Sequence, residues 1–397
     1  MAAPTVAPTD HAPPPPGADG LRVDGAAIVY RLYDVGYEVR LDRALDLLAA
    51  SAPERVRPVR GEAQALQIAN PPLTVILGHE RVTLAGLGAP RDAELSARIF
   101  DFGVVSLRLR IDAPPDLAWP DFVRFGNAVD VGTDLGALFA HHLRLLTERI
   151  EPAVDRPAVA AQTEDYVVFR VDALRDASGD APGNASGGAA DAARLDDAAV
   201  TPLLLAESRP LSAAARRELL PHRFSYYADD LAILTWDNAL VVEPRAGDAD
   251  VQYILEFANA QLLELRHYDA QLDALLPAMY DRIADARRGW RRLLRRGYAA
   301  LLGDLQARVA DSTELVERAE NALKVTDDVY LARVYSAALE IFRARAWRAG
   351  IDRKLGIVRD TYAMLNAESQ AARGEALEVT VVALILIEVV LALVLRH

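Results

Sequence analysis

Few side chains in this 397-residue chain combine the types and the spacing that metal or acid–base chemistry requires. Glu264 and His267 stand three residues apart, which is the Glu-x-x-His spacing of di-metal carboxylate bundles. Those bundles need the motif on two helices with two further glutamates, and the sequence has no second copy. Adjacent Asp229 and Asp230 would point to opposite faces of a strand, so they do not share one ligand. We therefore predict no metal site and no cofactor.

Motifs for nucleotide binding and nucleophilic catalysis are missing from the sequence. It contains no GxxxxGK[ST] or GxGxxG loop and no GxSxG turn. It also contains no cysteine, which excludes disulfides, thiolate metal ligands and cysteine nucleophiles. We predict no catalytic residues and expect a protein that is not an enzyme. An unrecognised hydrolase or metalloenzyme is a third alternative.

One cluster of positive charge stands out in a chain whose net charge is −13. Six arginines flank Trp290 within ten residues. Such a cluster could bind the RNA backbone, an acidic partner or anionic lipid, and the plain alternative is a solvated helix end with paired charges. The residues are Arg287, Arg288, Arg291, Arg292, Arg295 and Arg296.

The first two-thirds of the chain alternates short β-like and helical runs, which predicts an α+β region. A hairpin is expected to turn at Asp237 and Asn238. Proline-rich residues 1–21 are predicted to be disordered, and the Asp/Ala/Gly/Ser stretch 176–200 to be a flexible insertion. The predicted α+β domain therefore comprises residues 22–175, closed by strands within 201–245.

Residues 246–373 change to a helical pattern, which predicts a bundle or stalk. A seven-residue register of apolar positions begins at Val251 and continues to Met279, as in a coiled-coil seam. Polar Glu256 lies close to this seam. Asn259 and Gln261, at or beside it, could fix the register between packed helices.

Residues 374–395 are predicted to form a C-terminal transmembrane anchor. From Val379 to Leu395 only Thr380 and Glu388 interrupt the apolar run. Basic residues are more frequent before the segment than after it, which predicts a single-pass protein with its bulk in the cytoplasm. Together with the resemblance described below, this makes the bacterial inner membrane the expected location. Glu388 is expected to make an oligomer contact there, with Ala392 allowing close approach; a solitary glutamate or a proton relay are the alternatives.

Several longer motifs resemble those of a known family. The runs SYYADDLAILTWDNALVVEP, ELVERAENALKVTDDVYLARVY, DRKL and LILIEVVLAL are similar to those of bacterial members of the YagE-like family, also called the "required for meiotic nuclear division" family. The resemblance extends from about Phe100 to the C-terminus. It implies an α+β region, long helices and a membrane helix. Mitochondrial members are associated with the inner membrane, organellar translation and large homo-oligomers, with no known activity or cofactor.

The function expected from these patterns is a tail-anchored, self-associating membrane scaffold that displays an α+β and helical domain. The alternative is a membrane adaptor that tethers RNA or the translation machinery through the arginine cluster. The expected partners are the lipid bilayer and further copies of the chain, then RNA or an acidic protein. No small-molecule substrate is indicated.

Overall fold

A computed structural model of the chain describes residues 18, 20–49, 54–55, 70–176, 192–207, 209–243, 250–288 and 328–394. The chain divides into two compact units. Unit 1 comprises Met1–Glu264 and Lys324–Arg343, and unit 2 comprises Leu265–Leu323 and Ala344–His397. The segments predicted to be a disordered N-terminus and a flexible insertion lie largely outside the described residues.

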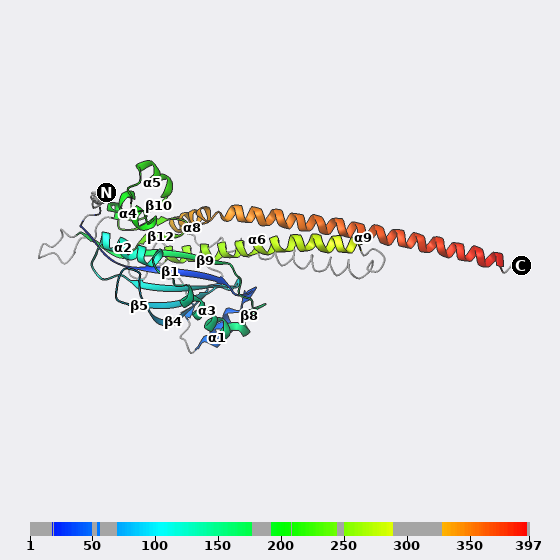
Figure 1. The fold of residues 1–397 in the computed structure, drawn as a ribbon, viewed down its shortest axis with the longest axis horizontal. Helices are drawn as coiled ribbons and strands as arrows, with labels where there is room; N and C mark the ends of the chain where they lie inside the picture. Colours follow the sequence, from blue (N-terminus) through cyan, green and yellow to red (C-terminus); the bar gives the residue numbers. More distant parts are fainter. Residues whose placement is uncertain are drawn as a thin grey trace, which may run out of the picture. The chain divides into compact units, whose positions relative to one another are not determined.

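Unit 1 is built on a ten-stranded mixed sheet (Figure 1). Its strand order is β10-β11-β12-β9-β1-β6-β5-β4-β3, with β7 also paired to β1. Neighbouring strands are antiparallel, except that β12 is parallel to β9. The strands are β1 (Leu21–Asp34), β3 (Glu54–Arg55), β4 (Leu73–Val82), β5 (Arg91–Ile99), β6 (Val104–Asp112), β7 (Leu117–Ala118), β9 (Thr163–Asp176), β10 (His222–Phe224), β11 (Leu231–Leu234) and β12 (Asn238–Val242). A separate pair joins β2 (Glu38–Val39) to β8 (Val154–Asp155).

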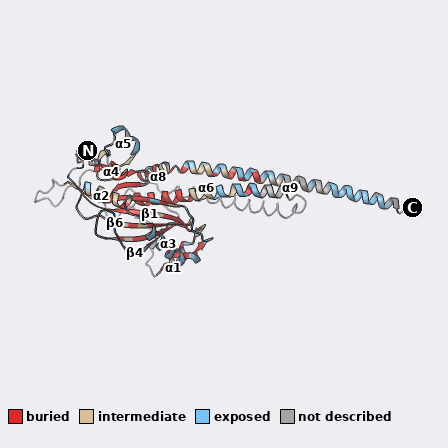
Figure 2. Ribbon diagram, in the orientation of Figure 1, coloured by how far each residue is buried: buried red, intermediate tan, exposed pale blue. Residues whose placement is uncertain are grey.

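One face of this sheet carries the apolar core. Successive side chains of a strand alternate between faces, so Val29, Leu109 and Phe169 all belong to the core while their sequence neighbours do not. The core is completed by Phe122 and other residues of α1 (Leu41–Leu48), α2 (Trp119–Asp130), α3 (Gly136–Ile150) and α4 (Asp197–Leu204). Figure 2 shows the strands of unit 1 as mostly buried. The short helix α5 (Ala213–Leu219) contributes no buried residue.

The opposite face is covered by two helices from later in the chain. The part of α6 (Asp250–Arg288) that belongs to unit 1 packs Phe257 against Phe100, with ring centroids 6.0 Å apart. At the end of α8 (Val329–Ile341), Phe342 packs against Tyr166 of β9 at 5.7 Å. Sheet and helices therefore form three layers, with a second interface between α6, α8 and the sheet.

Two local features define the ends of α8. Asp328 caps its first turn, because the side chain accepts hydrogen bonds from the backbone N–H groups of Tyr330 and Leu331 at 2.8 and 2.9 Å. Arg343 ends it in the left-handed region, with φ of 52°, which is uncommon for a residue with a side chain. The next helix, α9 (Ala344–Val394), begins directly afterwards.

Unit 2 holds the remainder of α6 together with α9. Leu272 and Met279 of α6 are buried, as are Ile351 and Val358 of α9. Lys354 joins the two helices through ion pairs to Asp269 at 2.7 Å and to Asp273 at 2.6 Å. Burial disfavours the charged amine, but these carboxylates outweigh it and raise the pKa of Lys354.

The predicted C-terminal membrane anchor is wrong. Within the described residues, no helix is both long enough and apolar enough to cross a membrane. The longest run in this part of α9 without an ionisable residue is Val379–Ile387, which at 1.5 Å per residue covers only ~14 Å of the ~30 Å hydrocarbon core. Glu388 ends this run. The single-pass, inner-membrane location with a cytoplasmic bulk is therefore not supported, whereas the α+β region followed by helices is present.

The residues from Thr74 to Gly88 hold one strand, β4, followed by a loop. Gly103 lies in the turn between β5 and β6. Residues 289–327 of the predicted helical bundle lie outside the described residues.

Gly103 gives a test of this turn. Its φ is +95°, and a Cβ added there would lie 1.9 Å from the carbonyl oxygen of Gly36. We expect Gly103→Ala to lower the free energy of unfolding by ~3 kcal/mol, because strain and a backbone clash combine. Gly88→Ala is the control: φ is +77° with nothing within 4 Å, so only strain remains and ~1 kcal/mol is expected. Urea unfolding followed by circular dichroism measures both, and equal losses would contradict the assignment.

Candidate functional site: the arginine-bearing face of the sheet

Four arginines occupy the sheet face beneath α6 and α8. The β5–β6 register places Arg98 opposite Ser106 and Ser96 opposite Arg108. Arg110 lies two residues further along β6, and Arg170 projects from β9 to the same side. All four alternate with residues of the apolar core, so the period of two puts them on the opposite face. Arg98 and Arg170 are more than nine-tenths buried.

The central contact of this face is the ion pair between Arg98 of β5 and Glu256 of α6. The exposed fractions of the two side chains are 8% and 1%. The guanidinium also lies over the ring of Tyr253, 4.6 Å from its centroid, and its Nε donates to Thr74 Oγ1 at 3.4 Å. Because both charges are buried, removal of one partner would leave the other uncompensated in a region of low dielectric.

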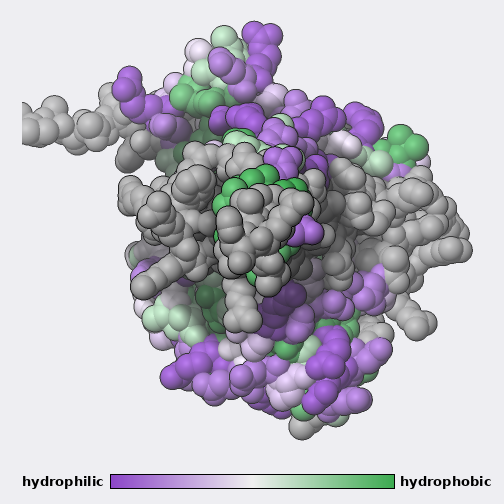
Figure 3. All heavy atoms as spheres, turned by 90° about the vertical axis from the view of Figure 1, so that its right-hand side faces the viewer, coloured by the Kyte–Doolittle hydropathy of each residue, from purple (hydrophilic) through white to green (hydrophobic). Residues whose placement is uncertain are grey.

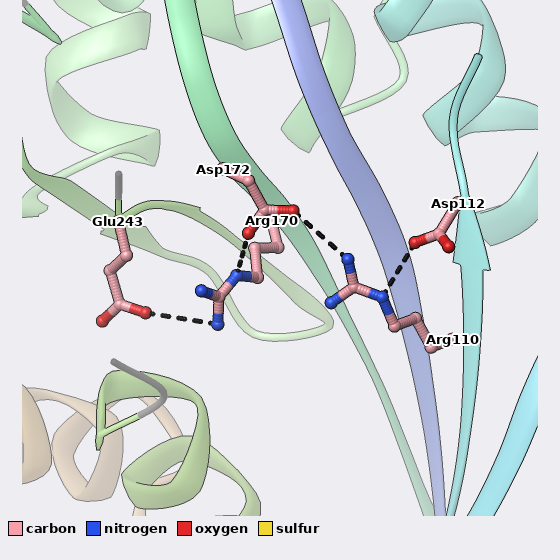
Figure 4. A network of polar contacts seen from close by, with 5 residues as sticks. All are labelled: Arg110, Asp112, Arg170, Asp172 and Glu243. Carbon is pink, nitrogen blue, oxygen red and sulfur yellow. Dashed lines mark hydrogen bonds and ion pairs between the residues drawn. The ribbon is translucent and has the colours of Figure 1, made fainter. Parts of the chain in front are cut away.

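A second network continues along the same face towards its solvent-exposed end (Figure 4). Arg110 donates to Asp112 at 2.8 Å and to Asp172 at 3.2 Å. Asp172 also accepts a 2.5 Å hydrogen bond from Arg170 Nε, and Arg170 is ion-paired with Glu243 at 3.7 Å. Positive and negative groups therefore alternate from β6 across β9 to the end of β12.

The pKa shifts agree with a structural arrangement of paired charges. Burial disfavours the charged form of Arg110, but Asp112 and Asp172 outweigh it and raise the pKa. Burial raises the pKa of Tyr30, and Glu256 adds to this shift. Tyr30 thus stays a neutral phenol among the charged groups. None of these shifts brings a group near neutral pH, where a general acid or base would titrate.

The predicted turn at Asp237 and Asn238 is held in place by buried hydrogen bonds to neighbouring elements. Asn238 is buried, and its amide donates to Asp130 at 2.9 Å and to the Leu204 carbonyl at 3.1 Å. Tyr166 donates to the carbonyl of Asn238 at 2.9 Å. Burial raises the pKa of Asp130, and the charge of Asp237 adds to the rise. The turn thereby ties β12 to β9 and to the helices on the core side.

The predicted register residues lie on the part of α6 that packs in unit 1. Asn259 is buried, but its amide donates to the carbonyl of Leu255 in the same helix at 2.9 Å. Gln261 is also buried and accepts a hydrogen bond from the hydroxyl of Tyr335 in α8. That Asn259 and Gln261 fix a helix register stays a prediction.

The other predicted site residues are not brought to this face by any described contact. Arg287 and Arg288 are at the end of α6 with side chains outside the described set, and Arg291, Arg292, Arg295 and Arg296 are outside the described residues altogether. Glu388 is exposed on α9, and the side chain of Ala392 is not described. Among the described residues, no group of three or more His, Asp or Glu side chains could hold a metal ion.

Comparison with known proteins identifies the family. Residues 24–249, more than half of the chain, match the model of the family described as "Uncharacterized protein MJ0711, N-terminal domain", and the chain belongs to this family. A relative is the uncharacterized protein MJ0711 of Methanocaldococcus jannaschii, 30% identical over 176 residues. That alignment covers 44% of this chain and 53% of the relative, so the chain matches about half of the relative's length. No solved structure matches the chain.

The family match overturns the predicted resemblance to the YagE-like family. Of the runs that carried the resemblance, SYYADDLAILTWDNALVVEP lies inside the matched region. ELVERAENALKVTDDVYLARVY, DRKL and LILIEVVLAL lie after residue 249, in predicted helices and an apolar C-terminus, and many unrelated helices share such patterns. The matched region instead contains the sheet and the helices on its core side.

The ion pair of Arg98 predicts a specific pattern of stability. Arg98→Met should lower the free energy of unfolding by ~3–5 kcal/mol, because Glu256 stays buried without its partner. The double variant Arg98→Met/Glu256→Leu should lose less than Arg98→Met alone. Arg124→Met, at an exposed pair with Asp121, is the control and should change stability by less than ~0.5 kcal/mol. A double variant that is less stable than both single variants in urea would contradict this interpretation.

Proposed function

We propose that this protein is a non-catalytic, self-associating scaffold, in which α9 joins copies of the chain and the sheet-containing unit is displayed. The observation that supports the proposal most is the apolar surface on the C-terminal half of α9. Between residues 379 and 391 nine large apolar side chains are exposed: Val379, Val381, Val382, Leu384, Ile385, Leu386, Ile387, Val390 and Leu391. Figure 2 shows this part of α9 as exposed wherever it is described.

The exposed apolar residues of unit 1 differ from those of α9 in that they do not form one continuous stretch. The exposed large apolar residues of unit 1, such as Ile76 and Val131, are scattered along the sequence. On the one face that Figure 3 shows, the described residues are mostly hydrophilic, with separate apolar patches. Single exposed apolar residues need no explanation, whereas a contiguous apolar surface marks an interaction site.

The geometry of the helix favours several neighbours over one. Successive residues of an α-helix are rotated by ~100°, so the consecutive residues Leu384, Ile385, Leu386 and Ile387 point to all sides. A helix that is apolar all round is normally enclosed by other helices. Further copies of the same helix would supply matching apolar surfaces, and one neighbour would leave part of the circumference uncovered. We therefore propose an assembly larger than a dimer.

The first test is the mass of the full-length chain by size-exclusion chromatography with light scattering. We expect a multiple of the 43.2 kDa chain. Leu386→Asp should weaken association ~100-fold or more, because it introduces a charge into an apolar interface. Val131→Asp, which makes the same kind of change at an exposed residue outside α9, should leave the mass unchanged. A monomeric wild-type protein, or one recovered on phosphatidylcholine vesicles instead of as an oligomer, would contradict the proposal.

Glu388 gives a second test within the same surface. Glu388 is the only ionisable residue in the sequence between Val379 and Leu395, and its side chain is exposed. We propose that it forms a hydrogen bond to a neighbouring copy of the chain. Glu388→Leu should then reduce the assembly on native electrophoresis, whereas Glu378→Leu, an exposed glutamate before the apolar stretch, should not. An assembly that becomes larger or tighter in Glu388→Leu would show that the glutamate opposes association.

The alternative of an RNA or translation adaptor depends on the arginine cluster around Trp290. Because that cluster lies outside the described side chains, the alternative stays a prediction from the sequence.

A further inference from the structure

Buried polar atoms without a partner gather around Arg98. In the part of the chain that the structure describes, Ser106 Oγ, Gln252 Nε2, Tyr253 OH and Glu256 Oε1 have no hydrogen-bond partner. The four residues are all at least nine-tenths buried, with exposed fractions of 0%, 5%, 4% and 2%. Unpartnered buried polar atoms are rare in folded proteins because each loses its hydrogen bonds to water.

Three of these residues, Ser106, Tyr253 and Glu256, pair with or contact Arg98. Ser106 lies opposite Arg98 in the strand register, and Glu256 forms the ion pair with it. Tyr253 lies under the guanidinium at 4.6 Å. Gln252 precedes Glu256 by four residues, so both side chains emerge from the same side of α6. The cluster therefore belongs to the contact between α6 and the sheet, within unit 1.

The donor and acceptor types restrict what could satisfy these atoms. Burial raises the pKa of Tyr253, so its hydroxyl stays protonated and can donate. Ser106 and Gln252 also offer N–H or O–H donors, whereas Glu256 Oε1 accepts. An anion would be repelled by Glu256, and a cation would be repelled by Arg98 and would leave the donors unpaired. A neutral molecule that both donates and accepts fits all four.

We propose that the contact between α6 and the sheet is an internal hydration site, in which ordered water molecules accept from Ser106, Gln252 and Tyr253 and donate to Glu256. Water is the smallest molecule with both properties, and buried waters in proteins typically bridge otherwise unsatisfied groups. Phe257, the residue after Glu256 in α6, packs against Phe100 at 6.0 Å and against Tyr335 at 6.2 Å, so this part of the contact between α6 and the sheet is also apolar.

Tyr253→Phe distinguishes a hydrated site from a dry one by the direction in which it changes the stability of the fold. If Tyr253 OH bonds to an ordered water, Tyr253→Phe removes a hydrogen bond and the folding equilibrium constant should fall about fivefold. If the site is dry, the same change removes a desolvated hydroxyl and stability should stay equal or rise. The ring over Arg98 is retained in both cases. Tyr226→Phe is the matched control, because its side chain is 54% exposed, and it should leave the constant unchanged.

Crystallography provides a second, independent test. A high-resolution crystal structure of the full chain should show water density within ~2.7–3.2 Å of Tyr253 OH and Glu256 Oε1. Such density together with a fivefold loss in Tyr253→Phe supports the proposal. Absence of density near all four atoms, or a Tyr253→Phe variant as stable as the wild-type chain, would overturn it. Both arms use monomer-level properties of unit 1, so the result does not depend on self-association through α9.

Discussion

The structure of unit 1 depends on one constraint: its sheet is buried on both faces, and one of those faces carries charged side chains among its apolar ones. The core side excludes water with helices α1 to α4, as an ordinary α+β domain does. The other side has to accommodate guanidinium groups, and it does so by pairing the buried Arg98 and Arg170 with carboxylates. The ion pair between Arg98 and Glu256 is the point where this requirement meets the covering helix, because one partner comes from β5 and the other from α6. Without such pairing, α6 could not bury its apolar residues on this face.

Much of the fold was predictable because local patterns and tertiary burial agree. The helix that begins at Leu41, the turn at Gly103 and the hairpin at Asp237 and Asn238 each have a signal within a few residues: spaced leucines, a left-handed glycine and turn-forming side chains. The apolar register of α6 also coincides with burial, since Val251, Ala258, Leu265, Leu272 and Met279 are all buried.

The arginine-bearing face was not predictable from the same patterns. An arginine that alternates with apolar residues in a strand normally indicates an exposed face, and nothing near Arg98 in the sequence signals that Glu256, 158 positions later, will cover it. The sequence pattern marks Glu256 only as a polar residue near an apolar seam. The membrane anchor, predicted from the apolar composition of the C-terminus, is wrong because no helix among the described residues is long and apolar enough to cross a membrane.

The boundary of the family match has a consequence for how the domain is defined. The match ends at residue 249, whereas α6 begins at Asp250 and α8 at Val329. Both helices that cover the arginine-bearing face therefore lie beyond the segment by which the family is recognised. The unit of sequence similarity and the unit of folding do not coincide in this protein. A chain that ended at residue 249 would lack α6 and α8, so Arg98 would lose its ion pair with Glu256 and that side of the sheet would be left uncovered.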